Sequence, residues 1–140
     1  MDAEVLVPKL DSLARRLLRI ESKKPFSLEQ LKVDVDLQDI ISNNLERAVQ
    51  QCVDLCSHVV AELGGGTPAT MGAGFDQLAM AGWIAPELAQ KLKNAVGFRN
   101  LAVHQYEKID WAIVYSICYK NVDDLKEFGR VISQRVGLKE

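Results

Sequence analysis

Hydrophobic residues in the first half of the chain recur at the spacing of α-helices. The N-terminal stripe advances in steps of four and three residues and comprises Leu6, Leu10, Leu13, Leu17 and Ile20. A longer stripe follows and comprises Leu37, Ile41, Leu45, Ala48, Cys52, Leu55 and Val59. Such steps place apolar side chains on one face of a helix. The pattern therefore predicts two long amphipathic helices, the first ending near Ser22 and the second near Leu63.

Prolines, glycines and capping residues predict where these helices start and stop. Pro25 ends the first helix. Ser27 and Gln30 have the spacing of a capping box, which predicts a short turn, and Asp36 is placed to cap the second long helix. The glycines at positions 64–66 end that helix. A phosphate-binding role for this glycine run is disfavoured, because the Gly-Lys-Ser/Thr of a Walker A loop does not follow.

The residue pattern in the second half of the chain predicts three more helices. Phe75, Leu78 and Ala79 indicate a short helix that closes near Gly82, and Pro86 suits the first position of the next one. A final helix is expected from Trp111 or Ile113 to about Val136, with a buried side made of Ile113, Ile117, Leu125, Phe128 and Ile132. The predicted fold is all-α: a single domain over residues 1–140, built as an up-and-down bundle of four to five helices with short connections.

Composition and charge narrow the class of protein. Of the 140 residues, 48% are hydrophobic and 26% are charged, which is typical of a globular domain. Pro8, Lys9 and Asp11 interrupt the first apolar segment, so no signal peptide or membrane span is expected and the predicted location is cytoplasmic. A net charge of −2 argues against a generally basic nucleic-acid-coating protein, so any such contact must be local.

The cysteines and one of the two histidines are interpreted as structural. The three cysteines, Cys52, Cys56 and Cys118, lie among apolar neighbours, and the first two are one helical turn apart rather than in a zinc-type pair. We expect reduced thiols in the core. His58 lies near the edge of the long apolar stripe, where a structural histidine with satisfied hydrogen bonds is the favoured interpretation.

An arginine occupies a position of the fourth predicted helix, which begins at Pro86, at which the pattern predicts an apolar residue. The stripe comprises Leu88, Leu92, Ala95, Arg99 and Ala102. The second histidine, His104, follows Arg99 by five positions, and Tyr106 comes two positions later. In an unbroken helix, residues five apart differ by about 140° in direction. Arg99 and His104 can therefore converge only if the helix ends between them or if a second copy of the chain contributes its own motif.

The position of Tyr106 depends on the local backbone in the same way. It shares a side with His104 in an extended segment and opposes it in a helix.

An arginine and a histidine, with no paired acid or metal cluster, suit phosphoryl chemistry on RNA, where the attacking 2′-hydroxyl belongs to the substrate. Histidine exchanges protons near neutral pH, and guanidinium binds phosphate oxygens and stabilises the charge that develops on them. No metal or cofactor is expected. Lys91, Lys93 and Lys108 add local positive potential that could weakly bind RNA, although a solvated lysine face explains them equally well.

With these residues in place, the chain resembles the HepT toxins of the HEPN superfamily. The resemblance is carried by Leu37-Gln38-Asp39, Asn44-Leu45-Glu46, Phe75 to Trp83, Leu88 to Leu92, and above all the stretch from Val96 to His104. That stretch matches the family's R-x4-6-H motif in its four-residue form, and Tyr106 completes the R-x4-H-x-Y version.

The resemblance implies a HEPN-like bundle that acts as a homodimeric, metal-independent endoribonuclease toxin of a type VII toxin–antitoxin system. Arg99 would then anchor and polarise the scissile phosphate, His104 would handle the proton, and Asn100 would support them. The implied partner is an MntA-like minimal nucleotidyltransferase, an antitoxin that transfers AMP from ATP to the motif tyrosine, here Tyr106. An adenylate there would repel or block RNA phosphates.

Two other interpretations remain open. The chain could be a non-catalytic HEPN interaction module that only binds a nucleotidyltransferase. Alternatively, the motif could be structural, with Arg99 at a dimer interface and His104 capping a helix end.

Overall fold

The described part of the chain, residues 2–137 of a computed structural model, is helical and contains no strand. The helices are α1 (Ala3–Ser22), α2 (Leu28–Val33), α3 (Val35–Glu62), α4 (Ala73–Met80), α5 (Pro86–His104), the 3₁₀ turn η1 (Tyr106–Lys108), α6 (Trp111–Ser116), the π-helical turn η2 (Ile117–Asn121) and α7 (Val122–Arg135). The predicted all-α fold is confirmed. None of the helices within residues 2–137 combines the length and apolar character that crossing a bilayer requires.

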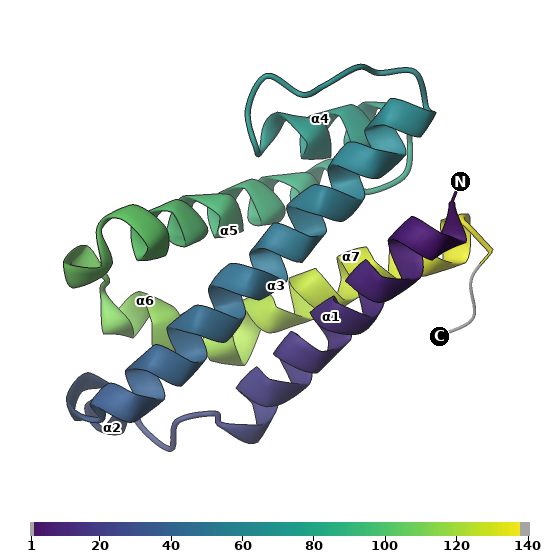
Figure 1. The fold of residues 1–140 in the computed structure, drawn as a ribbon. Coiled ribbons are helices and arrows are strands. Elements are labelled where there is room, and N and C mark those ends of the chain that lie inside the picture. The colour runs from purple at the N-terminus through teal and green to yellow at the C-terminus, as the bar shows by residue number, and fades with distance from the viewer. Residues whose placement is uncertain (1, 138–140) are drawn as a thin grey trace.

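The long helices alternate in direction (Figure 1). Helix α1 runs one way, α3 returns, α5 reverses again, and the α6–α7 segment leads back toward the start of α1. Helix α3 is central, because it packs against α1, α2, α4, α5 and α7. The up-and-down bundle is therefore organised around the long apolar stripe that the sequence shows.

Of the two predicted helix caps, the one at Ser27 is confirmed. The Ser27 hydroxyl accepts from the Gln30 amide at 3.1 Å, and the Gln30 side chain accepts from the Phe26 amide at 2.7 Å. The predicted cap of α3 is wrong by two residues: Asp34, not Asp36, accepts from the Leu37 amide at 3.0 Å. Asp36 lies inside the first turn, where its negative charge interacts favourably with the positive end of the helix dipole.

The last predicted helix is interrupted, and the prediction of its buried face is partly wrong. The π-helical turn η2 separates α6 from α7, and Ile113 is 56% exposed. The buried residues at the start of this segment are Val114, Cys118 and Val122, each four positions apart. A π turn holds more residues than an α turn, so steps of four keep one face across it. Beyond the turn, Leu125, Phe128 and Ile132 are buried as predicted.

The core is continuous and contains the free thiols. The rings of Phe75 and Phe128 meet edge to face, with centroids 5.4 Å apart. Cys52, Cys56 and Cys118 are buried and unpaired with one another, as expected. Burial raises the pKa of the Cys52 thiol, raises that of Cys56 to about 12 and raises that of Cys118 to about 11. These thiols are therefore protonated and unreactive at neutral pH.

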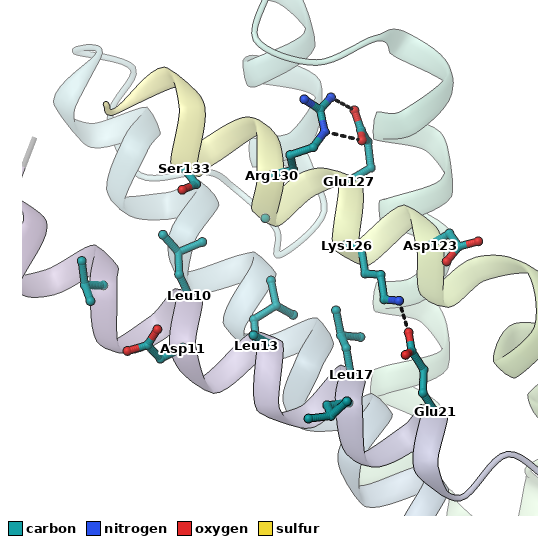
Figure 2. Close-up of a pocket in the computed structure, with 14 residues that line it drawn as sticks. Leu10, Asp11, Leu13, Leu17, Glu21, Asp123, Lys126, Glu127, Arg130 and Ser133 are labelled. Carbon is teal, nitrogen blue, oxygen red and sulfur yellow. Dashed lines mark hydrogen bonds and ion pairs between the residues drawn. The ribbon is translucent and has the colours of Figure 1, made fainter. Parts of the chain in front are cut away.

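Helices α1 and α7 approach closely and leave a groove of about 670 Å³ between them (Figure 2). A Cβ atom at Gly129 would lie 3.1 Å from Leu13 Cδ2, so glycine permits the close approach. Leucines of α1 line the groove, and the Lys126–Glu21 and Arg130–Glu127 pairs lie along it. This groove lies on α1 and α7, and none of the candidate site residues on α5 lines it.

Replacing Phe128 by alanine is expected to lower the free energy of unfolding by about 3–5 kcal/mol, because the ring is fully buried and its removal leaves a cavity. Urea denaturation measures the change. Ile113→Ala is the matched control in the same segment: its side chain is mostly exposed, so a loss below about 1 kcal/mol is expected. Equal losses for the two variants would contradict the assigned faces of this segment.

Candidate functional site

Helix α5 carries most of the candidate residues and remains helical through His104. Pro86 occupies its first turn, as predicted, and the helix ends at Gln105, whose backbone leaves the helical region with φ −144° and ψ 53°. Because α5 has no end between Arg99 and His104, the two side chains leave the helix about 140° apart. The first of the two predicted routes to convergence, a helix end between Arg99 and His104, is therefore excluded.

Arg99 lies half-buried where α5 faces the segment before α4. Its Nη1 donates to Asn100 Oδ1 at 3.1 Å and lies 3.9 Å from Met71 Sδ. The Nε atom is buried and finds no acceptor among residues 2–137, and no carboxylate in this range forms an ion pair with the guanidinium. Buried donors are normally paired, because an unmade hydrogen bond is costly. No carboxylate among the described residues therefore compensates the positive charge of Arg99.

His104 is exposed at the C-terminal end of α5. A histidine in this position is open to solvent and to a substrate. The other histidine, His58, is half-buried on α3, and its Nε2 is buried without a partner among the described residues, so the expected satisfied hydrogen bonds are not all present.

Tyr106 lies in η1, where three elements meet. Its hydroxyl donates to Asp39 Oδ1 of α3 at 2.7 Å, and the Ser42 hydroxyl lies 3.5 Å from it. Its ring meets the ring of Trp111 on α6 edge to face, with centroids 5.9 Å apart. The side chain remains 39% exposed. Burial, followed by the hydrogen bond to Asp39, raises the pKa of the Tyr106 phenol.

The three candidate lysines differ in their surroundings. Lys93 pairs with Asp76 at 3.0 Å, and Lys91 pairs with Asp124 at 3.6 Å. Lys108 lies in η1 and, together with Lys91, lines a cavity of about 400 Å³ between α3, α5 and the α6–α7 segment. Of the three, Lys108 lies nearest in sequence to His104 and Tyr106. No group of three or more His, Cys, Asp or Glu side chains within residues 2–137 is placed to ligate a metal.

Comparison with known protein families assigns the chain to one of them. The family described as ribonuclease HepT-like matches residues 13–132, a range that includes Arg99, Asn100, His104 and Tyr106. This chain belongs to the HepT-like ribonuclease family. The resemblance to HepT-type HEPN proteins, predicted from the motif, is thereby confirmed.

Individual HepT relatives match over most of their length. The mRNA nuclease HepT of Shewanella oneidensis is 30% identical over 129 residues, which cover 92% of this chain and 96% of the relative. The tRNA nuclease HepT of Aphanizomenon flos-aquae is 26% identical over 106 residues, covering 76% and 72% respectively. A solved structure of the tri-AMPylated Shewanella HEPN toxin in complex with its MNT antitoxin superposes with a TM-score of 0.87 at 30% identity, covering 96% of this chain and 99% of that toxin.

Three residues around Tyr106 were not predicted from the sequence as site residues: Asp39, Ser42 and Trp111. Asp39 and Ser42 lie three positions apart on α3, which puts them on neighbouring positions of one face. Asp39 lies 67 residues from Tyr106 in the sequence and Ser42 lies 64 residues from it, so these contacts are long-range. The sequence signal that could have identified Asp39 and Ser42 was their position as a polar pair beside the apolar stripe of α3.

Proposed function

We propose that this HepT-like protein is an endoribonuclease toxin that cleaves single-stranded RNA without a metal ion, at a site built from Arg99 and His104. The observation that carries the proposal is the uncompensated guanidinium of Arg99 in the family's motif, together with the exposed imidazole of His104. Asn100 supports the site by accepting a hydrogen bond from Arg99.

The proposed reaction uses the nucleophile that RNA itself carries. The 2′-oxygen forms a bond to the adjacent phosphorus while the bond from phosphorus to the 5′-oxygen breaks. His104 takes the proton from the 2′-hydroxyl, and a proton returns to the leaving 5′-oxygen. Arg99 holds the non-bridging oxygens and stabilises the charge that accumulates on them. The products are a 2′,3′-cyclic phosphate end and a 5′-hydroxyl end.

The active assembly is proposed to be a homodimer. Arg99 and His104 leave an unbroken α5 in different directions, so one copy does not bring them together along its own helix. A two-fold axis near the end of α5 would place Arg99 of one copy beside His104 of the other, because both copies present the same surface. RNA would then bind in a cleft shared by the two motifs, with Lys108, Lys91 and Lys93 as weaker phosphate contacts.

Regulation is proposed to act through Tyr106. An MntA-like nucleotidyltransferase antitoxin would bind the toxin and transfer AMP to this phenol, as the AMPylated Shewanella toxin in complex with its MNT antitoxin suggests. The ring is partly exposed and lies two residues beyond His104. An adenylate there adds negative charge and bulk beside the RNA-binding cleft, and both disfavour an incoming phosphate backbone.

The purified protein in EDTA is expected to cut single-stranded RNA and leave 2′,3′-cyclic phosphate ends, identified by mass spectrometry of the fragments. A DNA oligonucleotide of the same sequence is the matched control, because it lacks the 2′-hydroxyl and should stay intact. Intact RNA after prolonged incubation with the unmodified protein would contradict the proposal and favour a non-catalytic interaction module. Cleavage of the DNA would contradict the proposed role of the 2′-hydroxyl.

A further inference from the structure

The Tyr106 hydroxyl is held by the carboxylate of Asp39 in the structure of the unmodified chain. The hydrogen bond is 2.7 Å long, and the Trp111 ring packs edge to face on the phenol. The phenol is therefore fixed in direction by α3 and α6, although η1 itself is a single short turn.

We propose that Asp39 is the general base for AMP transfer to Tyr106, and that the toxin thereby supplies part of the chemistry of its own inactivation. The inference rests on the proposed function, since it concerns the same modification of the same tyrosine. Asp39 touches the reacting oxygen directly, so its role is chemical as well as positional.

The transfer step balances with ATP as the donor. The phenol oxygen of Tyr106 forms a bond to the α-phosphorus of ATP, and the bond between the α-phosphorus and the bridging oxygen breaks, releasing pyrophosphate. The phenol proton moves along the existing hydrogen bond to Asp39 Oδ1. The product is a phosphodiester that joins the phenol oxygen of Tyr106 to the 5′-oxygen of adenosine.

The surroundings of Tyr106 favour transfer of the proton during attack over ionisation beforehand. Burial and the Asp39 carboxylate both raise the pKa of the phenol, so a free phenolate is scarce at neutral pH. A carboxylate within hydrogen-bond reach accepts the proton as the new bond forms.

The neighbouring groups leave Asp39 as the candidate base. Ser42, the other hydrogen-bond partner of the Tyr106 oxygen, donates to it and therefore does not take its proton. Asp39 is the carboxylate that accepts the hydrogen bond of the Tyr106 hydroxyl.

The test uses the intact protein with ATP, magnesium chloride and an MntA-like minimal nucleotidyltransferase, and follows the intact mass over time. Asp39→Asn keeps an oxygen that can accept the hydrogen bond but loses the base, so adenylation at pH 7 is expected to slow by about 10²-fold or more. The rate ratio between parent and variant should shrink as the pH rises toward 9.5, because hydroxide and phenol ionisation replace the missing base. Asp39→Glu should recover a large part of the rate.

Two control variants separate Asp39 from its surroundings. Asp36→Asn removes an exposed carboxylate one helical turn earlier on α3 and should be adenylated at the parent rate. Tyr106→Phe should gain no adenylate, which locates the modified group.

Each outcome decides one claim. An unadenylated parent protein would overturn the proposed regulation, and the role of Asp39 with it. A parent and an Asp39→Asn variant that are modified equally fast would overturn the role of Asp39 alone. A slowed variant whose rate ratio stays constant with pH would make Asp39 a positioning residue and overturn the general-base assignment.

Discussion

Replacing His104 by alanine is expected to lower the rate of RNA cleavage by about 10²–10⁴-fold, the range that a single general acid–base group contributes. The imidazole is exposed at the end of α5, so its removal leaves the packing of the helix unchanged. Single-turnover cleavage of a labelled single-stranded RNA measures the chemical step separately from product release.

The chain offers a matched control for this variant in its other histidine. His58 lies half-buried on α3, outside the motif, and His58→Ala should cut RNA at nearly the parent rate. An His104→Ala protein with the parent's cleavage rate and thermal midpoint would remove His104 from the catalytic site.

The helices that were predicted well are those in which local chemistry and tertiary packing agree. In α3, the stripe from Leu37 to Val59 is buried along its whole length, since a single regular helix presents one face to α1 and α5. The start of α5 followed from Pro86, whose fixed φ and missing N–H suit a first helical position. Such signals lie within a few residues of the boundary that they set.

The prediction failed where the helix changes type. Steps of four through Val114, Cys118 and Val122 drift around an ideal α-helix, so the regular pattern predicted a different face and Ile113 was wrongly placed in the core. The π-helical turn η2 absorbs this drift. The helices on either side of η2 pack against different partners, α6 against α2 and α7 against α1, α3 and α5, and no spacing rule along the chain contains these contacts.

The candidate site likewise combines residues that the sequence pattern identifies with contacts that form only on folding. Arg99 was found because it interrupts an apolar stripe, a contrast that exists within α5 alone. Its uncompensated charge, by contrast, depends on Met71 and on the absence of a carboxylate among its neighbours in the described chain. The contact between Asp39 and Tyr106 joins α3 to η1 and exists only once the bundle has folded. Sequence spacing therefore identified the motif but not the groups that act on it.

Mixing inactive Arg99→Ala and His104→Ala proteins is expected to restore about a quarter of the parent cleavage rate, if the two residues meet across a dimer interface. Random pairing after co-refolding makes about half of the dimers mixed, and each mixed dimer holds one complete site in place of two. The Arg99 side chain of one copy then works with the His104 side chain of the other. If both residues acted within one copy, no mixed dimer would contain a complete site and the rate would stay at the background of the single variants.

A second mixture tests the same point by a loss of activity in place of a gain. When the parent protein is co-refolded with an equal amount of the Arg99→Ala/His104→Ala double variant, a shared site leaves activity only in parent homodimers, about a quarter of the parent rate. A site within one copy would keep one working copy in every mixed dimer and leave about half. The unbroken course of α5 from Pro86 to His104 predicts the first result, because the helix directs Arg99 and His104 to different sides of one copy.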